Sequence, residues 1–371
     1  FGLGVNMRKI VFHLNCLERG GAERVVTNLA NYFVKHEYQV YIATEWFGEK
    51  EYTVAEQINR VHVGLKDKQK ESSRVSQFIY RIINLRKFLK EIKPDIVIAF
   101  AQKANYRALM ATAFTKIPVI VSVRTDPYKD YKGIKNKLLI PLFWGRASGN
   151  VFQTKGAQQF FSEKIQKKSR IILNPIHESY LNIPKAVVRR KAVVQSGRLV
   201  HSKNQLMLLE AFETVHEAHP DYILELYGDD SGDGTKKLLE QFIADKQAHD
   251  YMKLMGASSK LAEQIADAAI FAFSSDFEGL PNALMEAMAL GLPVISTDCP
   301  CGGPATLIQN EVNGLLVPVG DKEAMAEGIK RLIEDSELAL NLGEKARDIS
   351  KLANTQTVCE QWKSYIEEIC K

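Results

Sequence analysis

The sequence lacks any apolar run long enough to cross a membrane. Its longest apolar stretches, near residues 96–101, 117–123 and 283–295, are shorter than the roughly eighteen residues that a membrane helix needs, and the last contains Glu286. The first six residues also lack the basic and apolar regions of a secretory signal peptide. We therefore predict no transmembrane helix and a cytoplasmic location.

Cysteine is scarce and is not arranged for cross-linking. The five cysteines are an odd number at scattered positions, which favours reduced thiols over a disulfide framework. Cys299 and Cys301 lack the spacing and the second ligand pair of a zinc site, so we expect a loop with free thiols there. The chain has 371 residues, of which 46% are hydrophobic and 25% charged, and this indicates a globular protein of two domains.

Charge is divided unequally along the chain. Residues 1–183 carry 30 Lys and Arg against 15 Asp and Glu, a net charge of +15, and the remainder carries 19 against 29, a net charge of −10. The overall charge of +5 hides this division. A basic first half indicates an anionic partner, either a nucleic acid or an acidic membrane surface.

Short β-branched runs alternate with helical patterns along the whole chain, which is typical of parallel sheets covered by helices on both faces. We predict an α/β protein of two doubly wound, Rossmann-like domains, residues 1–183 and 191–352. The intervening segment 174–190, with two prolines, is the expected linker. Residues 353–371 are expected to form a helix whose apolar stripe packs on the other domain. The expected strands are 8–14, 39–43, 61–63, 95–99, 119–123, 149–152, 192–195, 222–227, 251–254, 270–273, 294–296 and 314–317.

Ligands of open parallel sheets bind beyond the carboxyl ends of the strands, and three sequence motifs follow predicted strands. Gly20 and Gly21 come after the first strand and directly before a helical pattern, where backbone N–H groups can meet a phosphate. Neither a dinucleotide fingerprint nor a P-loop is present. A phosphate-binding loop and a plain tight turn therefore both fit this motif.

The second motif follows the first strand of the second half and contains Arg198 and Lys203. Two cations at a strand end can neutralise a diphosphate leaving group, although two solvated surface charges would look the same in isolation.

The third motif is the segment 273–293. Here Pro281 and Gly291 bracket a predicted helix, Glu278 lies on the entering loop, and Glu286 lies one turn into the helix. An unpaired carboxylate on such an apolar helix would be costly, so Glu286 should have a partner, for which a pair of ligand hydroxyls is suitable.

Together these motifs resemble a family 4 retaining glycosyltransferase of the GT-B fold, in which two Rossmann-like domains face each other across a cleft. The resemblance covers nearly the whole chain in order and is closest to bacterial enzymes that extend lipid-linked saccharides. It is carried by Gly20, Gly21, Ala22 and Glu23, by Gly197 to Leu199 with Lys203 to Gln205, by Glu278 and Glu286, and by Asn313 to Pro318.

The resemblance implies a role for each matching position. Glu286 would bind both ribose hydroxyls of the nucleotide, and Glu278 would bind hydroxyls of the transferred sugar. Arg198 and Lys203 would stabilise the leaving diphosphate. The remaining donor-binding positions are the loop glycines Gly20 and Gly21, the backbone at the start of the helix (Gly279, Leu280, Pro281, Asn282), and Met255 with Gly256 for the base.

The resemblance also implies a mechanism. The donor would be a UDP-sugar, and the hexose or N-acetylhexosamine would be transferred to a polyprenyl-diphosphate-linked saccharide by front-face displacement, with no nucleophilic carboxylate, metal or other cofactor. The acidic run from Asp229 to Asp233 resembles a metal loop, but we interpret it as a solvated turn.

One position departs from the pattern of the family. Many relatives carry a histidine after a strand of the first domain, whereas this chain has Arg124 and Asp126 in the corresponding stretch. We expect these two residues to handle the acceptor. His13 and His201 are interpreted as structural or surface histidines.

Two segments of the first half are basic and amphipathic. Residues 74–93 place Phe78, Ile82, Leu85 and Leu89 among arginines and lysines, and residues 128–146 place tyrosines, leucines and Trp144 among lysines. They fit a peripheral enzyme on the anionic inner face of the cytoplasmic membrane, although core faces with solvated lysines would give the same pattern.

Two other functions are weighed against this one. A sugar-nucleotide epimerase can share the two-domain architecture but has no use for a basic membrane face. A nucleic-acid-binding protein would use the basic half, but the sequence has no recognisable module with interleaved surface aromatics, so we expect no nucleic acid as partner.

Overall fold

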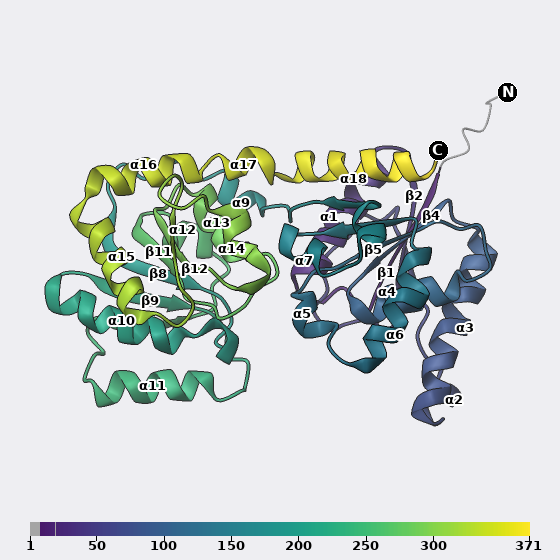
Figure 1. Cartoon of the computed structure of the whole chain (residues 1–371), viewed down its shortest axis with the longest axis horizontal. Coiled ribbons are helices and arrows are strands. Elements are labelled where there is room, and N and C mark those ends of the chain that lie inside the picture. Colours follow the sequence, from purple (N-terminus) through teal and green to yellow (C-terminus); the bar gives the residue numbers. More distant parts are fainter. Residues whose placement is uncertain (1–7, 19) are drawn as a thin grey trace. The chain divides into compact units, whose positions relative to one another are not determined.

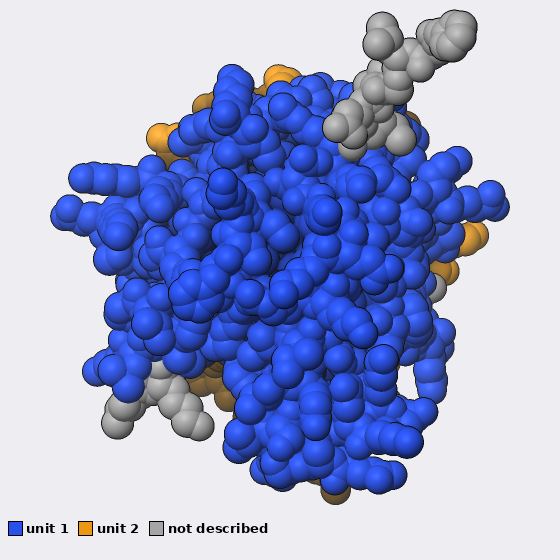
Figure 2. Space-filling view, turned by 90° about the vertical axis from the view of Figure 1, so that its right-hand side faces the viewer, with its two compact units in different colours: residues 1–175, 356–371 blue, residues 176–355 orange. Residues whose placement is uncertain are grey.

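The computed structural model describes residues 8–18 and 20–371. The chain divides into a first unit, residues 1–175 with 356–371, and a second unit, residues 176–355, and Figure 2 colours the two separately. The division falls at Pro175, eight residues before the predicted end of the first domain at residue 183. Residues 176–183 instead belong to the second unit and contain α9 (Glu178–Leu181).

The first unit is built on a parallel sheet with the strand order β3-β2-β1-β4-β5-β6-β7. Central strands such as β4 are buried along their whole length, as expected where helices cover both faces of a sheet. The strands are β1 (Lys9–Leu14), β2 (Gln39–Thr44), β3 (Asn59–His62), β4 (Ile96–Phe100), β5 (Val119–Ser122), β6 (Gly149–Phe152) and β7 (Ser169–Ile171).

Helices surround this sheet in Figure 1. They are α1 (Gly21–Lys35), α2 (Asp67–Lys70), α3 (Arg74–Ile92), α4 (Gln102–Ala111), α5 (Pro127–Asp130), α6 (Ile134–Phe143), α7 (Lys155–Gln159) and α8 (Glu163–Gln166), with a 3₁₀ turn η1 (Trp144–Arg146).

The last helix, α18 (Thr355–Ile369), belongs to the core of the first unit although it ends the chain (Figure 1). Val358, Cys359, Trp362 and Ile366 join the buried cluster formed by β1, β2, β4 and α1. The ring of Trp362 lies 5.5 Å from that of Phe100. The stripe that the sequence predicts on this helix is therefore covered by strands and a helix from the start of the chain.

The second unit repeats the architecture with a parallel sheet of order β10-β9-β8-β11-β12-β13. Its strands are β8 (Arg190–Ser196), β9 (Ile223–Tyr227), β10 (Met252–Gly256), β11 (Ala268–Phe273), β12 (Val294–Thr297) and β13 (Leu315–Val317). Its further helices are α10 (Gln205–Ala218), α11 (Thr235–Asp245), α12 (Leu261–Ile265), α13 (Asn282–Ala289), α14 (Gly303–Leu307), α15 (Lys322–Glu334), α16 (Ser336–Ala346) and α17 (Ile349–Leu352), with 3₁₀ turns η2 (His201–Lys203) and η3 (Pro300–Gly302).

The prediction of two doubly wound α/β domains is confirmed. Each sheet runs outward in both directions from its first strand, the order that defines this fold. Among the strands of residues 8–18 and 20–371, β7 alone is absent from the prediction; it is short and lies at the edge of the first sheet, and two of its three residues are exposed. Within the described residues, no helix combines the length and the apolar character needed to cross a membrane.

Candidate active site

The strand order of the second unit identifies where a ligand should bind. From β8 the chain adds β9 and β10 on one side of the sheet, and it then returns to add β11, β12 and β13 on the other side. The direction in which strands are added therefore reverses between β8 and β11. In doubly wound sheets this reversal opens a crevice at the carboxyl ends of the two strands. The loops that follow β8 and β11 contain Arg198, Lys203 and Glu278, so the sequence-predicted cations and the first acid lie at the carboxyl ends of two neighbouring strands.

The loop after β8 is held close to the end of β9. A Cβ atom on Gly228 would lie 1.9 Å from the carbonyl oxygen of Gly197, so position 228 requires glycine where the backbone after β9 passes the backbone after β8. Arg198 is exposed, and its guanidinium has no partner within the described part of the chain, while its carbonyl accepts a hydrogen bond from Gln205. The loop thus leaves one free cation at the strand end.

Lys203 and Glu278 form an ion pair between the loops that follow β8 and β11. Glu278 also accepts a hydrogen bond of 3.1 Å from the hydroxyl of Ser275, and the ammonium of Lys203 lies 5.0 Å from the centre of the Phe273 ring. Both side chains are largely buried. The arrangement places one carboxylate and two cations at the same end of the sheet.

Sequence reasoning missed the polar groups that hold these side chains. The hydroxyl of Ser274 donates to the carbonyl of Lys203 at 2.8 Å and accepts from Gln195 at 3.1 Å. The side chain of Asn204 donates to Asp276 at 2.7 Å. The sequence did contain a signal for them, namely two serines, Ser274 and Ser275, directly after an apolar strand. Both are fully buried, which is unusual for serine.

Glu286 lies on α13, as the sequence predicts, and it is buried among the apolar side chains of that helix. The helix begins at Asn282 with Pro281 as its N-terminal flanking residue, and Gly279 and Leu280 lead into it. A Cβ atom on Gly303 would lie 2.1 Å from the carbonyl oxygen of Gly279, so the start of α14 packs tightly against this loop. That contact fixes the path by which the backbone enters α13.

The remaining predicted residues of the second unit lie around the same edge of the sheet. Met255 is half exposed at the end of β10, next to Gly256. Asp233 accepts hydrogen bonds from the backbone N–H groups of His201 and Thr235, at 2.9 and 3.0 Å, and these bonds lower the pKa of its carboxyl to about 2. Asp233 therefore ties the turn after β9 to the loop that carries Lys203.

In the first unit, Gly20 and Gly21 lie at the start of the fifteen-residue helix α1, after β1. Burial raises the pKa of Glu23 in the first turn of this helix. Residue 19 of the same sequence motif lies outside the described residues.

The two predicted acceptor residues have structural partners. The guanidinium of Arg124 bonds the side-chain oxygen of Asn174 and lies 5.5 Å from the centre of the Phe100 ring, and burial lowers its pKa to about 9. Asp126 is buried, and its carboxylate accepts a hydrogen bond of 2.9 Å from the N–H of Tyr128 at the start of α5.

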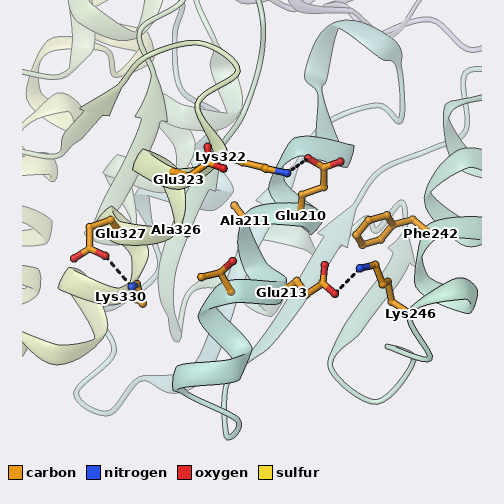
Figure 3. Close-up of a pocket in the computed structure, with 11 residues that line it drawn as sticks. Glu210, Ala211, Glu213, Phe242, Lys246, Lys322, Glu323, Ala326, Glu327 and Lys330 are labelled. Carbon is orange, nitrogen blue, oxygen red and sulfur yellow. Dashed lines mark hydrogen bonds and ion pairs between the residues drawn. The ribbon is translucent and has the colours of Figure 1, made fainter.

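A separate hollow of the second unit is lined by α10, α11 and α15 and has a volume of about 500 Å³. Figure 3 shows its charged side chains in pairs, Lys246 with Glu213, Lys322 with Glu210 and Lys330 with Glu327, at 2.7, 3.3 and 2.8 Å. None of the predicted site residues lines it. Because its lysines pair with neighbouring carboxylates, it offers little net charge to a ligand.

Two family models match the chain, one in each half. "Glycosyltransferase Family 4" matches residues 19–180, and "Glycosyl transferases group 1" matches residues 178–349. The two matches follow each other along the chain and together leave out only its two ends.

Three similar proteins illustrate these matches. An exopolysaccharide phosphotransferase of Streptomyces coelicolor is 31% identical over 59% of this chain, but the match spans 23% of that protein. The GalNAc-alpha-(1→4)-GalNAc-alpha-(1→3)-diNAcBac-PP-undecaprenol alpha-1,4-N-acetyl-D-galactosaminyltransferase of Campylobacter jejuni is 25% identical over 98% of this chain and 99% of its own length. The structure of Anabaena HepE with UDP and glucose superposes with a TM-score of 0.81 at 19% identity, over 97% of this chain and 100% of that chain.

The fold neighbours, the two consecutive family matches and the pair of acids after the strand reversal agree with one another. The chain belongs to the family 4 glycosyltransferases of the GT-B fold and is a glycosyltransferase.

Proposed function

We propose that the protein is a retaining glycosyltransferase that transfers a hexose or N-acetylhexosamine from a UDP-sugar to a polyprenyl-diphosphate-linked saccharide without a metal ion. The observation that carries this proposal is the convergence of Arg198, Lys203 and Glu278 at the strand reversal of the second sheet, with Glu286 on the adjoining helix. A nucleotide diphosphate needs cations for its phosphates and a carboxylate for its ribose, and this edge of the sheet provides both.

Each residue has a role in the proposed donor complex. Glu286, the acid on α13, accepts hydrogen bonds from the two ribose hydroxyls of the donor. Lys203 leaves its ion pair with Glu278 to bind the diphosphate, and the freed Glu278 accepts hydrogen bonds from hydroxyls of the sugar. Arg198, which is free of partners within the described residues, binds the same diphosphate with its planar fork.

In the proposed reaction the acceptor hydroxyl approaches the sugar on the face from which the diphosphate departs. The bond between the anomeric carbon and the phosphate oxygen breaks, the bond to the acceptor oxygen forms, and the acceptor proton passes to the departing diphosphate. Negative charge grows on that diphosphate in the transition state, where Arg198 and Lys203 stabilise it most. These two cations supply the stabilisation that a divalent cation would provide.

The similar proteins support the choice of donor and acceptor. The Anabaena fold neighbour has been solved with UDP and glucose, and the Campylobacter relative carries an undecaprenol diphosphate saccharide in its name. The match to the Campylobacter enzyme covers 98% of this chain and 99% of that protein, which favours an acceptor of the same class.

We further propose that the first unit rests on an anionic membrane surface. The structure divides the amphipathic segment 74–93 into two faces, because Leu85 and Leu89 are buried, whereas Val75, Ile79 and Ile83 are exposed in a stripe along α3. On α6 the side chains of Leu138 and Leu142 are exposed as well. Exposed apolar stripes on basic helices are typical of proteins that lie in the lipid interface. The apolar residues of α3 and α6 are therefore only partly buried in the core, and the others are exposed to solvent.

The direct test is a transfer assay with UDP-glucose, UDP-N-acetylglucosamine and UDP-N-acetylgalactosamine against short polyprenyl-diphosphate-linked saccharides, in EDTA. We expect one donor to give a product whose new glycosidic bond has the α configuration of the donor by NMR. An inverted linkage, a strict requirement for added Mg²⁺ or Mn²⁺, or sugar isomerisation without an acceptor would contradict the proposal.

A further inference from the structure

The acidic turn after β9, residues 229–233, supports the loop that contains Arg198 and Lys203. The sequence predicts a solvated turn here, and the side chains of its three aspartates are exposed. Hydrogen bonds nevertheless join the turn to the loop after β8 at several points. Solvation is therefore not the only property of this turn, because it also holds part of the candidate donor site.

The parallel pairing of β8 with β9 continues beyond the ends of both strands. The N–H of Gly197 donates to the carbonyl of Tyr227 at 2.9 Å, and the N–H of Leu199 donates to the carbonyl of Asp229 at 2.8 Å. Alternate residues of the loop are thus bonded as they are in a parallel ladder. Arg198 lies between two of these bonded residues, so its backbone is held while its side chain is exposed.

The last aspartate of the turn reaches further along the same loop. One carboxylate oxygen of Asp233 accepts a hydrogen bond of 2.9 Å from the N–H of His201, and the other accepts one of 3.0 Å from the N–H of Thr235. His201 begins the 3₁₀ turn η2, which ends at Lys203. Thr235 begins α11. Asp233 therefore joins the start of α11 to the backbone turn from which the side chain of Lys203 extends.

The segment after β11 holds the same loop from its other side. The N–H of Asp276 donates to the carbonyl of Ser202 at 3.0 Å, and the carboxylate of Asp276 accepts a hydrogen bond of 2.7 Å from the side chain of Asn204. Residues 201–204 are thus bonded both to the turn after β9 and to the segment after β11. Asp233 supplies the side-chain bond to the first of these residues.

The charge of Asp233 and its hydrogen bond have opposite consequences for an anionic ligand. The N–H groups of His201 and Thr235 lower the pKa of this carboxyl to about 2, so it is negatively charged at neutral pH. Negative charge near a diphosphate weakens binding by Coulomb repulsion. Coulomb's law alone therefore predicts that removal of Asp233 tightens diphosphate binding, whereas loss of the bond to His201 predicts weaker binding. The sign of the change separates the two effects.

We infer that Asp233 is a positioning residue for the cations that bind the donor diphosphate, an inference that rests on the proposed function. Its bond to the N–H of His201 holds the backbone that leads to Lys203, next to the ladder that holds the backbone of Arg198. Cations on an ordered backbone need little rearrangement as charge develops on a leaving group, and small displacements of such groups lower rates strongly. Asp233 itself contacts neither the diphosphate nor the sugar.

The test compares the binding of UDP with that of uridine, which has no phosphate, to the full chain by titration calorimetry. Asp233→Ala should weaken UDP binding about tenfold and change uridine binding by less than about twofold, because the displaced cations contact only the phosphates. Asp233→Ser keeps a hydroxyl that can accept the N–H of Thr235 within the turn, but this shorter side chain does not also reach His201. It should therefore lose as much UDP affinity as Asp233→Ala.

A matched control and a double-mutant cycle show how Asp233 acts. Asp230→Asn removes the same charge from the same turn, and its amide oxygen can still accept the N–H of Gly232, as the carboxylate does at 2.9 Å. It should bind UDP as tightly as the wild type or slightly more tightly. In a Lys203→Ala background, Asp233→Ala should weaken UDP binding by less than about threefold, because one of the cations that it positions is gone.

The possible outcomes separate this inference from the proposed function. Unchanged or tighter UDP binding in Asp233→Ala, full UDP affinity in Asp233→Ser, an equal loss in Asp230→Asn, or an equal loss of uridine binding would overturn the positioning role. If the wild type binds UDP and any of these results is found, the positioning role fails and the proposed donor site stands. If the wild type does not bind UDP, both fail. Should Asp233→Ala not fold, Asp233→Ser supplies the comparison.

Discussion

Lys203 and Glu278 are 75 residues apart in the sequence, and their side chains form an ion pair at the carboxyl edge of the second sheet. Their strands, β8 and β11, are neighbours in the sheet, with Val194 beside Phe271, so the loops that follow must meet. Without a donor the two charges satisfy each other. A donor diphosphate would compete with Glu278 for the ammonium of Lys203. Its binding would break the ion pair and so free the Glu278 carboxylate to accept hydrogen bonds from the sugar.

Removal of either cation should slow turnover strongly. We predict that Arg198→Ala and Lys203→Ala each lower kcat by about 10²–10³, because in the proposed mechanism both stabilise charge that develops on the leaving group. Lys237→Ala, which removes an exposed lysine on α11, is the matched control and should leave kcat unchanged. Near-normal turnover in the two site variants, measured with folding verified by thermal melting, would refute the leaving-group role.

Membrane binding should depend on both salt and the exposed stripe of α3. We predict that the protein sediments with phosphatidylglycerol vesicles but not with phosphatidylcholine vesicles, and less as salt rises from about 0.05 to 0.5 M. The double variant Ile79→Ser with Ile83→Ser should weaken partitioning at least tenfold, because two apolar side chains no longer enter the interface. Leu340→Ser, at an exposed leucine of the second unit, is the control. Salt-independent or lipid-independent sedimentation would exclude this surface.

His13 should make the first unit less stable in mild acid. Its pKa is about 3 in the folded protein and 6.5 in its ordinary state, so between these values the unfolded chain binds a proton that the folded chain does not. Stability from this residue is therefore present above pH 6.5 and falls as pH decreases toward 3, by up to about 1.4 kcal/mol per pH unit.

The check is urea unfolding at pH 7 and pH 5, followed by tryptophan fluorescence, since all three tryptophans lie in the first unit. The wild type should lose about 2 kcal/mol more than His13→Gln over this interval. An equal loss in the two proteins would show that His13 is not held neutral.

Tyr365 anchors α18 to the sheet of the first unit. Its hydroxyl accepts a hydrogen bond of 2.9 Å from the N–H of Asn150 and donates one of 2.6 Å to the carbonyl of Lys168, at the ends of β6 and β7. Tyr365→Phe leaves a buried backbone N–H without a partner and should cost about 1–3 kcal/mol of unfolding free energy. Tyr80→Phe, at an exposed tyrosine of α3, should cost almost nothing. A similar loss from both changes would argue against the anchor.

Most of the fold could be predicted because its strands are buried on both faces and read as uninterrupted apolar runs. The run 96–100 is an example, since every residue of β4 is buried. β7 escaped prediction because its three residues, Ser169 to Ile171, form a partly exposed edge where no apolar pattern is required. The division at Pro175 falls within the segment 174–190 that the sequence predicts as the linker, although this segment also contains the short helix α9.

The candidate site could be predicted only where charged residues stand close together in the sequence, next to a predicted strand or helix end. The spacing of Glu278 and Glu286 indicated two acids near a helix start, and the structure places both there. A pocket of the first unit lined by Asn15, Trp46 and side chains of α3 and α4 could not be found from the sequence, because these four separated segments are brought together only by the strand order. The cap that Asp126 provides to α5 depends on a local backbone turn that composition does not reveal.

The central claim, a UDP-sugar site in the second unit, is tested most directly by titration calorimetry of UDP, GDP and ADP in EDTA. We predict that UDP binds and that GDP and ADP bind far more weakly. Glu286→Gln should weaken UDP binding at least tenfold through its contacts with the ribose hydroxyls, while Glu337→Gln, an exposed glutamate of α16, should not. No binding of UDP at millimolar concentration, or equal affinity in wild type and Glu286→Gln, would contradict the account.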